Sequence, residues 1–223
     1  TMSKSASTDF HIIRHLPPHP DATLAAYGHE EIQLVTDHQL VVDRLKAVAD
    51  ILPTQATWHV SPTPRTRLTG EMLRAAGKNL DPAAIVEDLE FIEQRFGAFS
   101  GNLFTVLRER EDYRAYTADP INTRPPEGES FNDIFNRVGT RLDAVAATPG
   151  PHIIVTHGGV VRAAVAHALK VPLTTILSGL EVLPLAHIHM AATENNGQIS
   201  WKLRGISHGP DFRIDHVSPL GYA

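Results

Sequence analysis

The chain of 223 residues contains no cysteine. Disulfide bonds, thiol nucleophiles and metal sites built on cysteine are therefore excluded. A reducing compartment agrees with this composition, and we expect a cytoplasmic protein.

Long hydrophobic runs are also missing. No apolar stretch approaches the roughly 20 residues that a helix needs to cross a bilayer. Residues 1–7 contain no apolar core of signal-peptide length, and Thr1 stands before Met2. We expect residues 1–8 to be a disordered or tag-like N-terminus, and we expect no membrane partner.

Neither sign of charge dominates the chain. Lys and Arg number 20 against 25 Asp and Glu, which gives a formal net charge of -5, and the basic residues are scattered. This distribution is atypical of nucleic-acid-binding proteins, so we expect no nucleic-acid partner. A hydrophobic content of 42% is typical of a globular protein, and we place a single domain at residues 9–223.

Short apolar runs alternate with segments in which apolar residues recur at helical spacing. The short runs predict strands over 10–14, 56–60, 84–89, 153–156, 185–191 and 199–204. The helical spacing predicts helices over 37–52, 62–76, 101–117, 129–147 and 160–169. Thr36 or Asp37 is the expected N-cap of the first helix, and Gly77 is the expected end of the second.

This alternation predicts the α/β class. We expect a three-layer α/β/α sandwich with a mostly parallel central sheet, because strands that alternate with helices are joined by crossovers on both faces. Residues 95–130 are expected to form a small, cap-like helical insertion in that domain.

Two histidines follow two of the predicted strands. His15 comes after the strand over 10–14 with Arg14 beside it, and His157 comes after the strand over 153–156. Ligands of open α/β sheets bind outside the carboxyl ends of the strands. An imidazole nucleophile with a guanidinium neighbour is suited to accepting a phosphoryl group, which predicts an enzyme.

Five separated motifs resemble those of the histidine phosphatase superfamily, also called the phosphoglycerate mutase-like family. They occur in the family's order, and the resemblance covers most of the chain. The motifs are Arg14-His15-Leu16, the Ser-Pro-x-x-Arg-x-x-x-Thr pattern from Ser61 to Thr69, the acidic motif from Glu93 to Phe99, Gly128-Glu129-Ser130, and the run from His157 to Arg162.

The resemblance implies a role for each matching residue. His15 would be the nucleophile that forms a phosphohistidine, and Arg14 and Arg65 would bind the phosphate oxygens. His157, with Gly158 beside it, would complete the phosphate pocket as a donor.

The resemblance also implies the general acid and base, which would be Glu93. Its place before Phe96-Gly97 favours it over Glu90, because spacing alone does not choose between the two. The neighbouring arginines Arg67, Arg137 and Arg162 are expected to be surface residues or members of structural ion pairs.

We expect no cofactor and no metal. The sequence shows no His-x-x-x-His helix motif and no paired-carboxylate motif. His187 and His189 are expected on opposite faces of a strand, where they would not share one ion.

The chain departs from the family pattern at several positions. Leu16 stands where the family has glycine, and Ser100 replaces a carboxylate that many relatives carry. The stretch from Ala26 to His29 resembles the alpha-ribazole phosphatases, which favours the phosphatase branch.

We therefore expect a metal-independent phosphatase that acts on a small phosphorylated metabolite. Two alternatives stay open: a mutase-type phosphotransferase, and a non-catalytic phosphate-binding or interaction module on the same fold. A homodimer is possible, and the sequence does not determine the oligomeric state.

Overall fold

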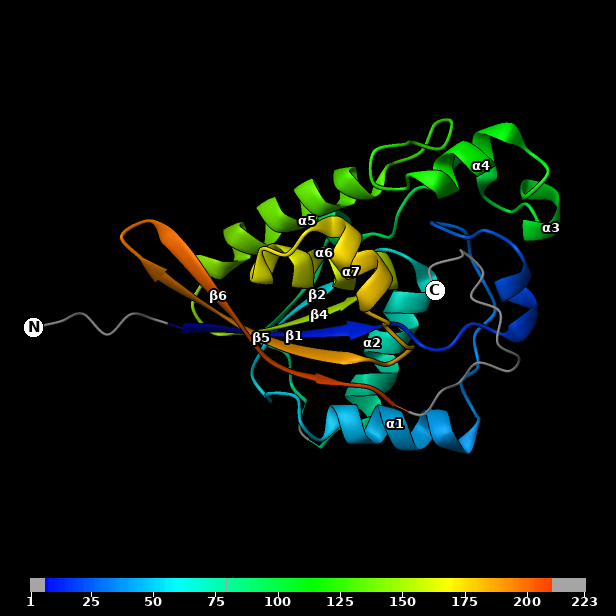
Figure 1. Ribbon diagram of the computed structural model, residues 1–223. Helices are drawn as coiled ribbons and strands as arrows, with labels where there is room; N and C mark the ends of the chain where they lie inside the picture. Colours follow the sequence, from blue (N-terminus) through cyan, green and yellow to red (C-terminus); the bar gives the residue numbers. More distant parts are fainter. Residues whose placement is uncertain (1–6, 79, 210–223) are drawn as a thin grey trace, which may run out of the picture.

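The computed structural model describes residues 7–78 and 80–209, which form a six-stranded sheet between two layers of helices (Figure 1). The strand order is β3-β2-β4-β1-β5-β6. The strands are β1 (Ser7–Arg14), β2 (Thr57–Val60), β3 (Ala84–Glu87), β4 (Pro151–Thr156), β5 (His187–Asn195) and β6 (Gln198–Ser207).

The sheet is mostly parallel, as the sequence predicts. β1 pairs in parallel with β4, and β2 pairs in parallel with both β4 and β3. β5 is antiparallel to β1 and to β6, so β5 alone among these strands runs in the opposite direction. A hairpin turn joins β5 to β6, and its residues Asn196 and Gly197 adopt the positive φ angles of 52° and 77° that such a turn requires.

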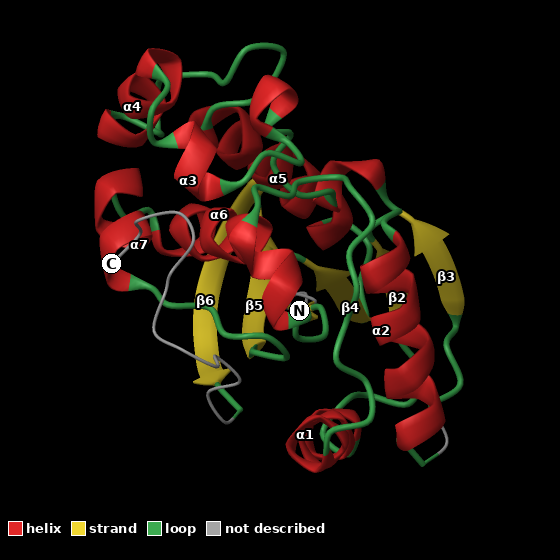
Figure 2. Cartoon of the chain, turned by 90° about the vertical axis from the view of Figure 1, so that its right-hand side faces the viewer, coloured by secondary structure: helices red, strands yellow, loops and turns green. Residues whose placement is uncertain are grey.

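Helices cover both faces of the sheet (Figure 2), which confirms the three-layer fold. One layer contains α1 (Gln39–Ala49) and α2 (Pro64–Ala76), and the other contains α5 (Phe131–Ala146), α6 (Gly158–Leu169) and α7 (Leu173–Gly179). Alternate residues of β1 serve the two layers, since Ile13 packs with the α1 and α2 side chains and Ile12 with those of α5 and α6.

Helix starts differ from the prediction by a few residues. The N-cap of α1 is His38, whose Nδ1 accepts the Leu40 N–H at 3.3 Å, and not Thr36 or Asp37. Gly77 ends α2 as predicted. A capping box at Ser130 starts α5, because the Ser130 and Asp133 side chains each accept the other's backbone N–H.

The N-terminal boundary is corrected by β1. Ser7 and Thr8 belong to this strand, and the Thr8 hydroxyl donates to the Ala146 carbonyl at 3.1 Å. The expected N-terminal extension over residues 1–8 therefore does not reach residue 8, and residues 1–6 lie outside the described part of the chain.

The single helix predicted over 101–117 is wrong. The structure has two short helices, α3 (Phe104–Leu107) and α4 (Glu111–Ala118), together with the 3-10 turns η1 (Pro20–Leu24), η2 (Leu89–Phe91) and η3 (Gly97–Phe99). Leu107 and Tyr113 are both buried in one aromatic cluster. Residues six apart lie on different faces of a continuous helix, so the chain must turn between them.

The aromatic cluster lies beyond the sheet. Its members are Ala26, Phe96, Phe99, Phe104, Leu107, Tyr113 and Tyr116. Figure 1 shows α3 and α4 past the end toward which β1 points. The insertion predicted over 95–130 thus lies near the carboxyl ends of the strands.

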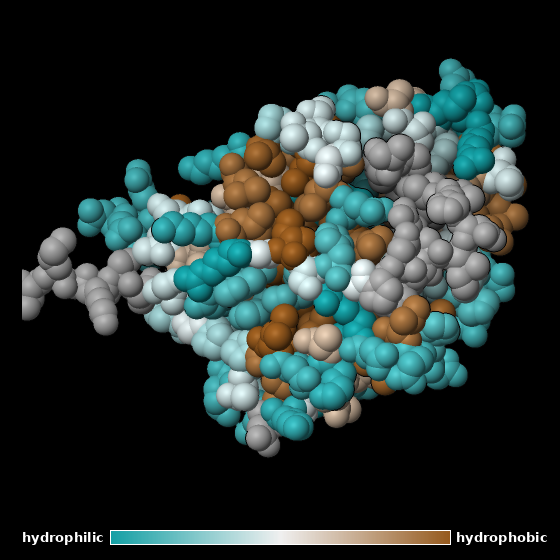
Figure 3. All heavy atoms as spheres, turned by 60° about the horizontal axis from the view of Figure 1, so that its bottom comes forward, coloured by the Kyte–Doolittle hydropathy of each residue, from teal (hydrophilic) through white to brown (hydrophobic). Residues whose placement is uncertain are grey.

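Apolar and hydrophilic side chains share the face of the molecule that Figure 3 shows. Figure 3 shows the side of the molecule that carries α1, where brown apolar areas are separated by hydrophilic side chains. Within the described residues, no helix is long and apolar enough to cross a membrane.

Leu16, which replaces the family glycine, is a core residue. Its side chain is fully buried in the cluster that contains Ile13, Val41 and Leu45. Its backbone N–H donates to the Thr69 hydroxyl at 3.0 Å. The side chain therefore points into the core below the end of β1.

Leu16→Ala should lower the free energy of unfolding by about 2–5 kcal/mol, because it leaves a cavity in a packed core. Urea denaturation followed by circular dichroism measures this loss. Leu24→Ala is the matched control, since that side chain is 59% exposed and should change stability little. Equal stability of Leu16→Ala and wild type would contradict the assigned packing.

Candidate active site

The parallel pairing of β1 and β4 brings the two predicted histidines together. Arg14 is opposite Thr156 in the register, so His15 and His157 follow at the same end of neighbouring strands. The His15 N–H donates to the Thr156 carbonyl at 2.9 Å. The two ring centroids are 5.3 Å apart, and both side chains are buried.

The environment of His15 keeps its imidazole neutral with one nitrogen available. Nδ1 lies 2.7 Å from the Leu16 carbonyl, an acceptor only, so Nδ1 carries the proton and Nε2 keeps its lone pair. Burial, followed by the charges of Arg65 and Arg14, holds the pKa of His15 well below its usual value. A neutral imidazole with a bare Nε2 is the form that can attack phosphorus.

Arg65, in the first turn of α2, is buried beside both histidines. Its Nε donates to His157 Nδ1 at 3.3 Å, and its Nη1 donates to the Glu30 carbonyl at 2.9 Å. Its Nη2 donates to the Gly28 carbonyl, and its guanidinium lies 5.5 Å from the centre of the Tyr27 ring. Arg65 thus joins the loop after β1 to the site.

His157 makes two hydrogen bonds within the site. Because Nδ1 accepts from Arg65, its Nε2 carries the proton and donates to the Ser61 hydroxyl at 2.7 Å. Burial, then the charges of Arg65, His15 and Arg14, lower the pKa of His157 well below its usual value. Ser61 belongs to the second motif, but the sequence analysis gave it no role.

Arg14 has a buried donor without a partner among the described residues. Its Nη1 donates to the Val182 carbonyl at 2.5 Å, whereas its buried Nε has no partner in the described part of the chain. A methyl group built on Gly158 would lie 3.6 Å from that Nε. A buried donor without a partner is costly, and an anionic oxygen would satisfy it.

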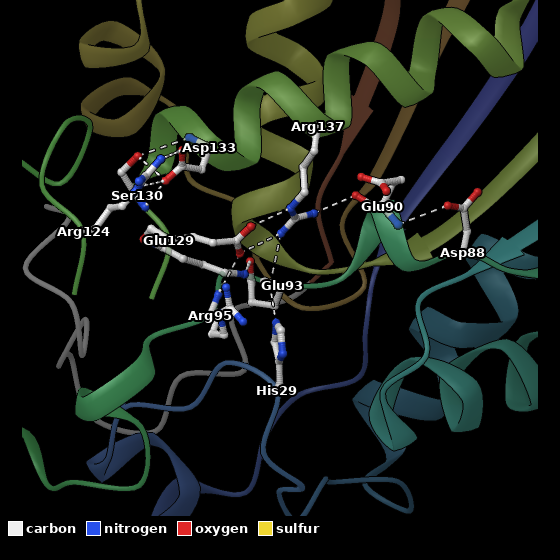
Figure 4. Close-up of polar contacts among 11 residues, drawn as sticks. His29, Asp88, Glu90, Glu93, Arg95, Arg124, Glu129, Ser130, Asp133 and Arg137 are labelled. Carbon is white, nitrogen blue, oxygen red and sulfur yellow. Dashed lines mark hydrogen bonds and ion pairs between the residues drawn. The ribbon is translucent and has the colours of Figure 1, made fainter. Parts of the chain in front are cut away.

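The structure brings Glu93, and not Glu90, to this group. The Glu93 carboxylate accepts the Gly159 N–H at 3.3 Å, in the first turn of the helix that follows His157. Its charge also acts on Arg65. The Glu90 side chain is exposed, and Figure 4 shows the two carboxylates apart.

The three arginines expected to be surface or ion-pair residues occupy different surroundings. Arg67 forms an exposed ion pair with Glu87, as predicted. Arg162 donates to the Leu180 carbonyl at 2.9 Å. Arg137 forms the expected structural ion pair, which is with Glu129, and its further contacts are described below.

The expectation that His187 and His189 point to opposite faces is wrong. Residues two apart in a strand share a face, and both rings stack on His11, with centroid distances of 5.1 and 4.5 Å. Even so, the described residues contain no group of three or more His, Asp or Glu arranged to hold a metal ion.

The family model of the histidine phosphatase superfamily (branch 1) matches residues 10–203. This chain belongs to that superfamily. Phosphoserine phosphatase 1 of Hydrogenobacter thermophilus is 29% identical over 160 residues, which are 70% of this chain and 72% of that protein.

Solved structures share the fold of this superfamily member. Bacillus stearothermophilus YhfR matches with a TM-score of 0.72 and 20% identity, over 96% of this chain and 99% of its own. A putative alpha-ribazole-5'-P phosphatase from Escherichia coli matches with a TM-score of 0.70 and 17% identity, over 93% and 99% of the two chains.

The two adjacent glycines of the last motif differ in their surroundings. A methyl group on Gly159 would lie 2.5 Å from Glu93 Oε1, too close for any real contact, whereas Gly158 leaves ordinary van der Waals distances. The sequence analysis named only Gly158. Nothing in a His-Gly-Gly run indicates which glycine faces the carboxylate.

Gly159→Ala should displace the Glu93 carboxylate and lower kcat/KM for an alkyl phosphate by about tenfold or more, because a general acid, the role expected for Glu93, loses efficiency steeply when it is misplaced. Gly158→Ala is the comparison variant and should lose much less. Steady-state phosphate release measures both. A larger loss of kcat/KM in Gly158→Ala than in Gly159→Ala would contradict the position assigned to the Glu93 carboxylate.

Proposed function

We propose that this protein is a metal-independent phosphatase that hydrolyses a small phosphate monoester through a phosphohistidine on His15. The observation that supports this most strongly is the state of His15, a buried neutral imidazole with a bare Nε2 in the field of two guanidinium groups. The positive charge of these groups would attract a tetrahedral dianion to the nucleophile.

The reaction follows from the positions of these groups. Nε2 of His15 attacks phosphorus while the bond to the ester oxygen breaks, and Arg14 and Arg65 neutralise the charge on the phosphoryl oxygens. Glu93, in its protonated form, gives its proton to the leaving alcohol. The products of this step are the free alcohol and the phosphohistidine.

The second step returns the enzyme to its starting state. The Glu93 carboxylate takes a proton from water, the water oxygen attacks phosphorus, and the bond between phosphorus and Nε2 breaks. Inorganic phosphate leaves, and Glu93 is again protonated for the next cycle. Glu93 is the only group of the chain that donates or accepts a proton in this scheme.

Two likenesses support the phosphatase branch. The relatives described above include proteins named as a phosphoserine phosphatase and a putative alpha-ribazole-5'-P phosphatase. The stretch from Ala26 to His29, which resembles the alpha-ribazole phosphatases, contacts Arg65 through Tyr27 and Gly28. This loop would therefore contact the leaving group of a bound metabolite.

His15→Ala should abolish hydrolysis, with a loss of about a thousandfold or more, while the circular dichroism spectrum stays unchanged. The assay is phosphate release across small phosphorylated metabolites, with mass spectrometry of the trapped phosphoprotein. Turnover retained by His15→Ala would remove His15 as the nucleophile. Transfer of phosphate to a second metabolite would instead favour a mutase, and binding without turnover a non-catalytic module.

Phosphate release should continue at an unchanged rate after dialysis against excess EDTA, because two guanidinium groups supply the charge that a metal ion would otherwise provide. The same substrate is assayed before and after dialysis, with and without added Mg²⁺ or Zn²⁺. Complete loss that an added metal restores would overturn the metal-independent mechanism.

A further inference from the structure

The segment that carries Glu93 is held from α5 by Arg137 (Figure 4). Arg137 Nη1 donates to the Glu90 carbonyl at 2.7 Å, and its Nη2 donates to the Glu93 carbonyl at 3.2 Å. Both contacts are to the main chain. The guanidinium therefore fixes the backbone of Glu93.

Glu129 contacts the same segment just after Glu93, at Gln94 and Arg95. Its carboxylate accepts Arg137 Nε at 3.0 Å and Nη2 at 3.2 Å, and it also accepts the Arg95 N–H at 3.0 Å. The Glu129 main chain pairs with Arg95 and accepts the Gln94 side-chain amide at 2.6 Å. The segment is thus held at residue 90, before Glu93, and at residues 93–95.

The ion pair between Arg137 and Glu129 is largely buried. The side chains of Arg137 and Glu129 are 16% and 18% exposed, so solvent screens the pair only in part. Burial acts to raise the pKa of Glu129, but the hydrogen bonds and charge of Arg137 and the Arg95 N–H hold it below its usual value. The Glu129 carboxylate therefore stays charged at neutral pH.

A nearby pair shows what an ordinary ion pair looks like here. Arg124 forms two hydrogen bonds of 2.6 Å with Asp133 at the start of the same helix. Its side chain is 67% exposed, and within the described residues its hydrogen bonds go to that carboxylate alone. Arg137 differs from Arg124 because it also donates hydrogen bonds to the main-chain carbonyls of residues 90 and 93.

We propose that Arg137 and Glu129 are positioning residues that hold the Glu93 carboxyl at Gly159, where it can protonate the leaving alcohol. This inference rests on the proposed phosphatase function. Arg137 contacts neither the Glu93 carboxylate nor, in this scheme, the substrate. Since α5 and α6 pack in one core cluster, α5 fixes Glu93 relative to the helix that follows His157.

The test compares two esters that differ in their need for a proton. An alkyl phosphate such as β-glycerol phosphate releases a basic alkoxide and needs a general acid, whereas p-nitrophenyl phosphate releases a stable phenolate and needs little help. The readout is kcat/KM, because it covers only the steps up to phosphohistidine formation.

Arg137→Gln should lower kcat/KM for the alkyl ester by about tenfold to a hundredfold and that for the nitrophenyl ester by about threefold at most. Arg124→Gln, the matched control, should leave the ratio of the two values unchanged. In a Glu93→Gln background, Arg137→Gln should add no further loss on the alkyl ester.

Three results would overturn the positioning role while wild-type hydrolysis remains intact. These are an equal loss on both esters, additive losses with Glu93→Gln, and a change of ratio in Arg124→Gln alone. If Arg137→Gln does not fold, Glu129→Gln replaces it and must show the same selective loss. A wild type that hydrolyses neither ester would instead overturn the proposed function itself.

Discussion

The site depends on one pairing, the parallel contact between β1 and β4. Its register places Arg14 opposite Thr156, and each strand is followed directly by a histidine. Because both strands end at the same edge, residues far apart in the chain meet there. The remaining groups are then supplied by the two helix layers, Arg65 by α2 and Gly159 by α6.

This pairing concentrates positive charge in a buried place. Two guanidiniums adjoin two imidazoles whose pKa values are lowered, first by burial and then by those guanidiniums. Neutral imidazoles avoid further like-charge repulsion, and Glu93 in its ionised form offsets part of the remaining charge. The buried Nε of Arg14 stays without a partner in the described residues, as a donor suited to an anion. The positive charge that lowers the proton affinity of His15 and His157 also suits the binding of an anionic phosphoryl group.

Sequence reasoning placed the sheet, both helix layers and the meeting of His15, His157, Arg14 and Arg65, because strand-helix alternation and motif order are local properties. It failed where the outcome depends on packing. The break between α3 and α4 follows from aromatic burial, the burial of Leu16 follows from its packing in the core cluster, and the importance of Gly159 follows from the position of the Glu93 carboxylate. The error at His187 and His189 was one of strand geometry and was avoidable from sequence. The sequence does not distinguish Arg137 from other helix arginines, because its hydrogen bonds to the Glu90 and Glu93 carbonyls depend on the tertiary structure.

The most direct measurement of the central claim is a crystal structure of the protein with orthovanadate, which mimics the phosphoryl group in transfer. The account predicts vanadium bonded to Nε2 of His15, with its oxygens hydrogen-bonded to Arg14 and Arg65 and one apical oxygen facing Glu93. Vanadate bound away from His15, or bound there with both arginines still turned to protein carbonyls only, would contradict it.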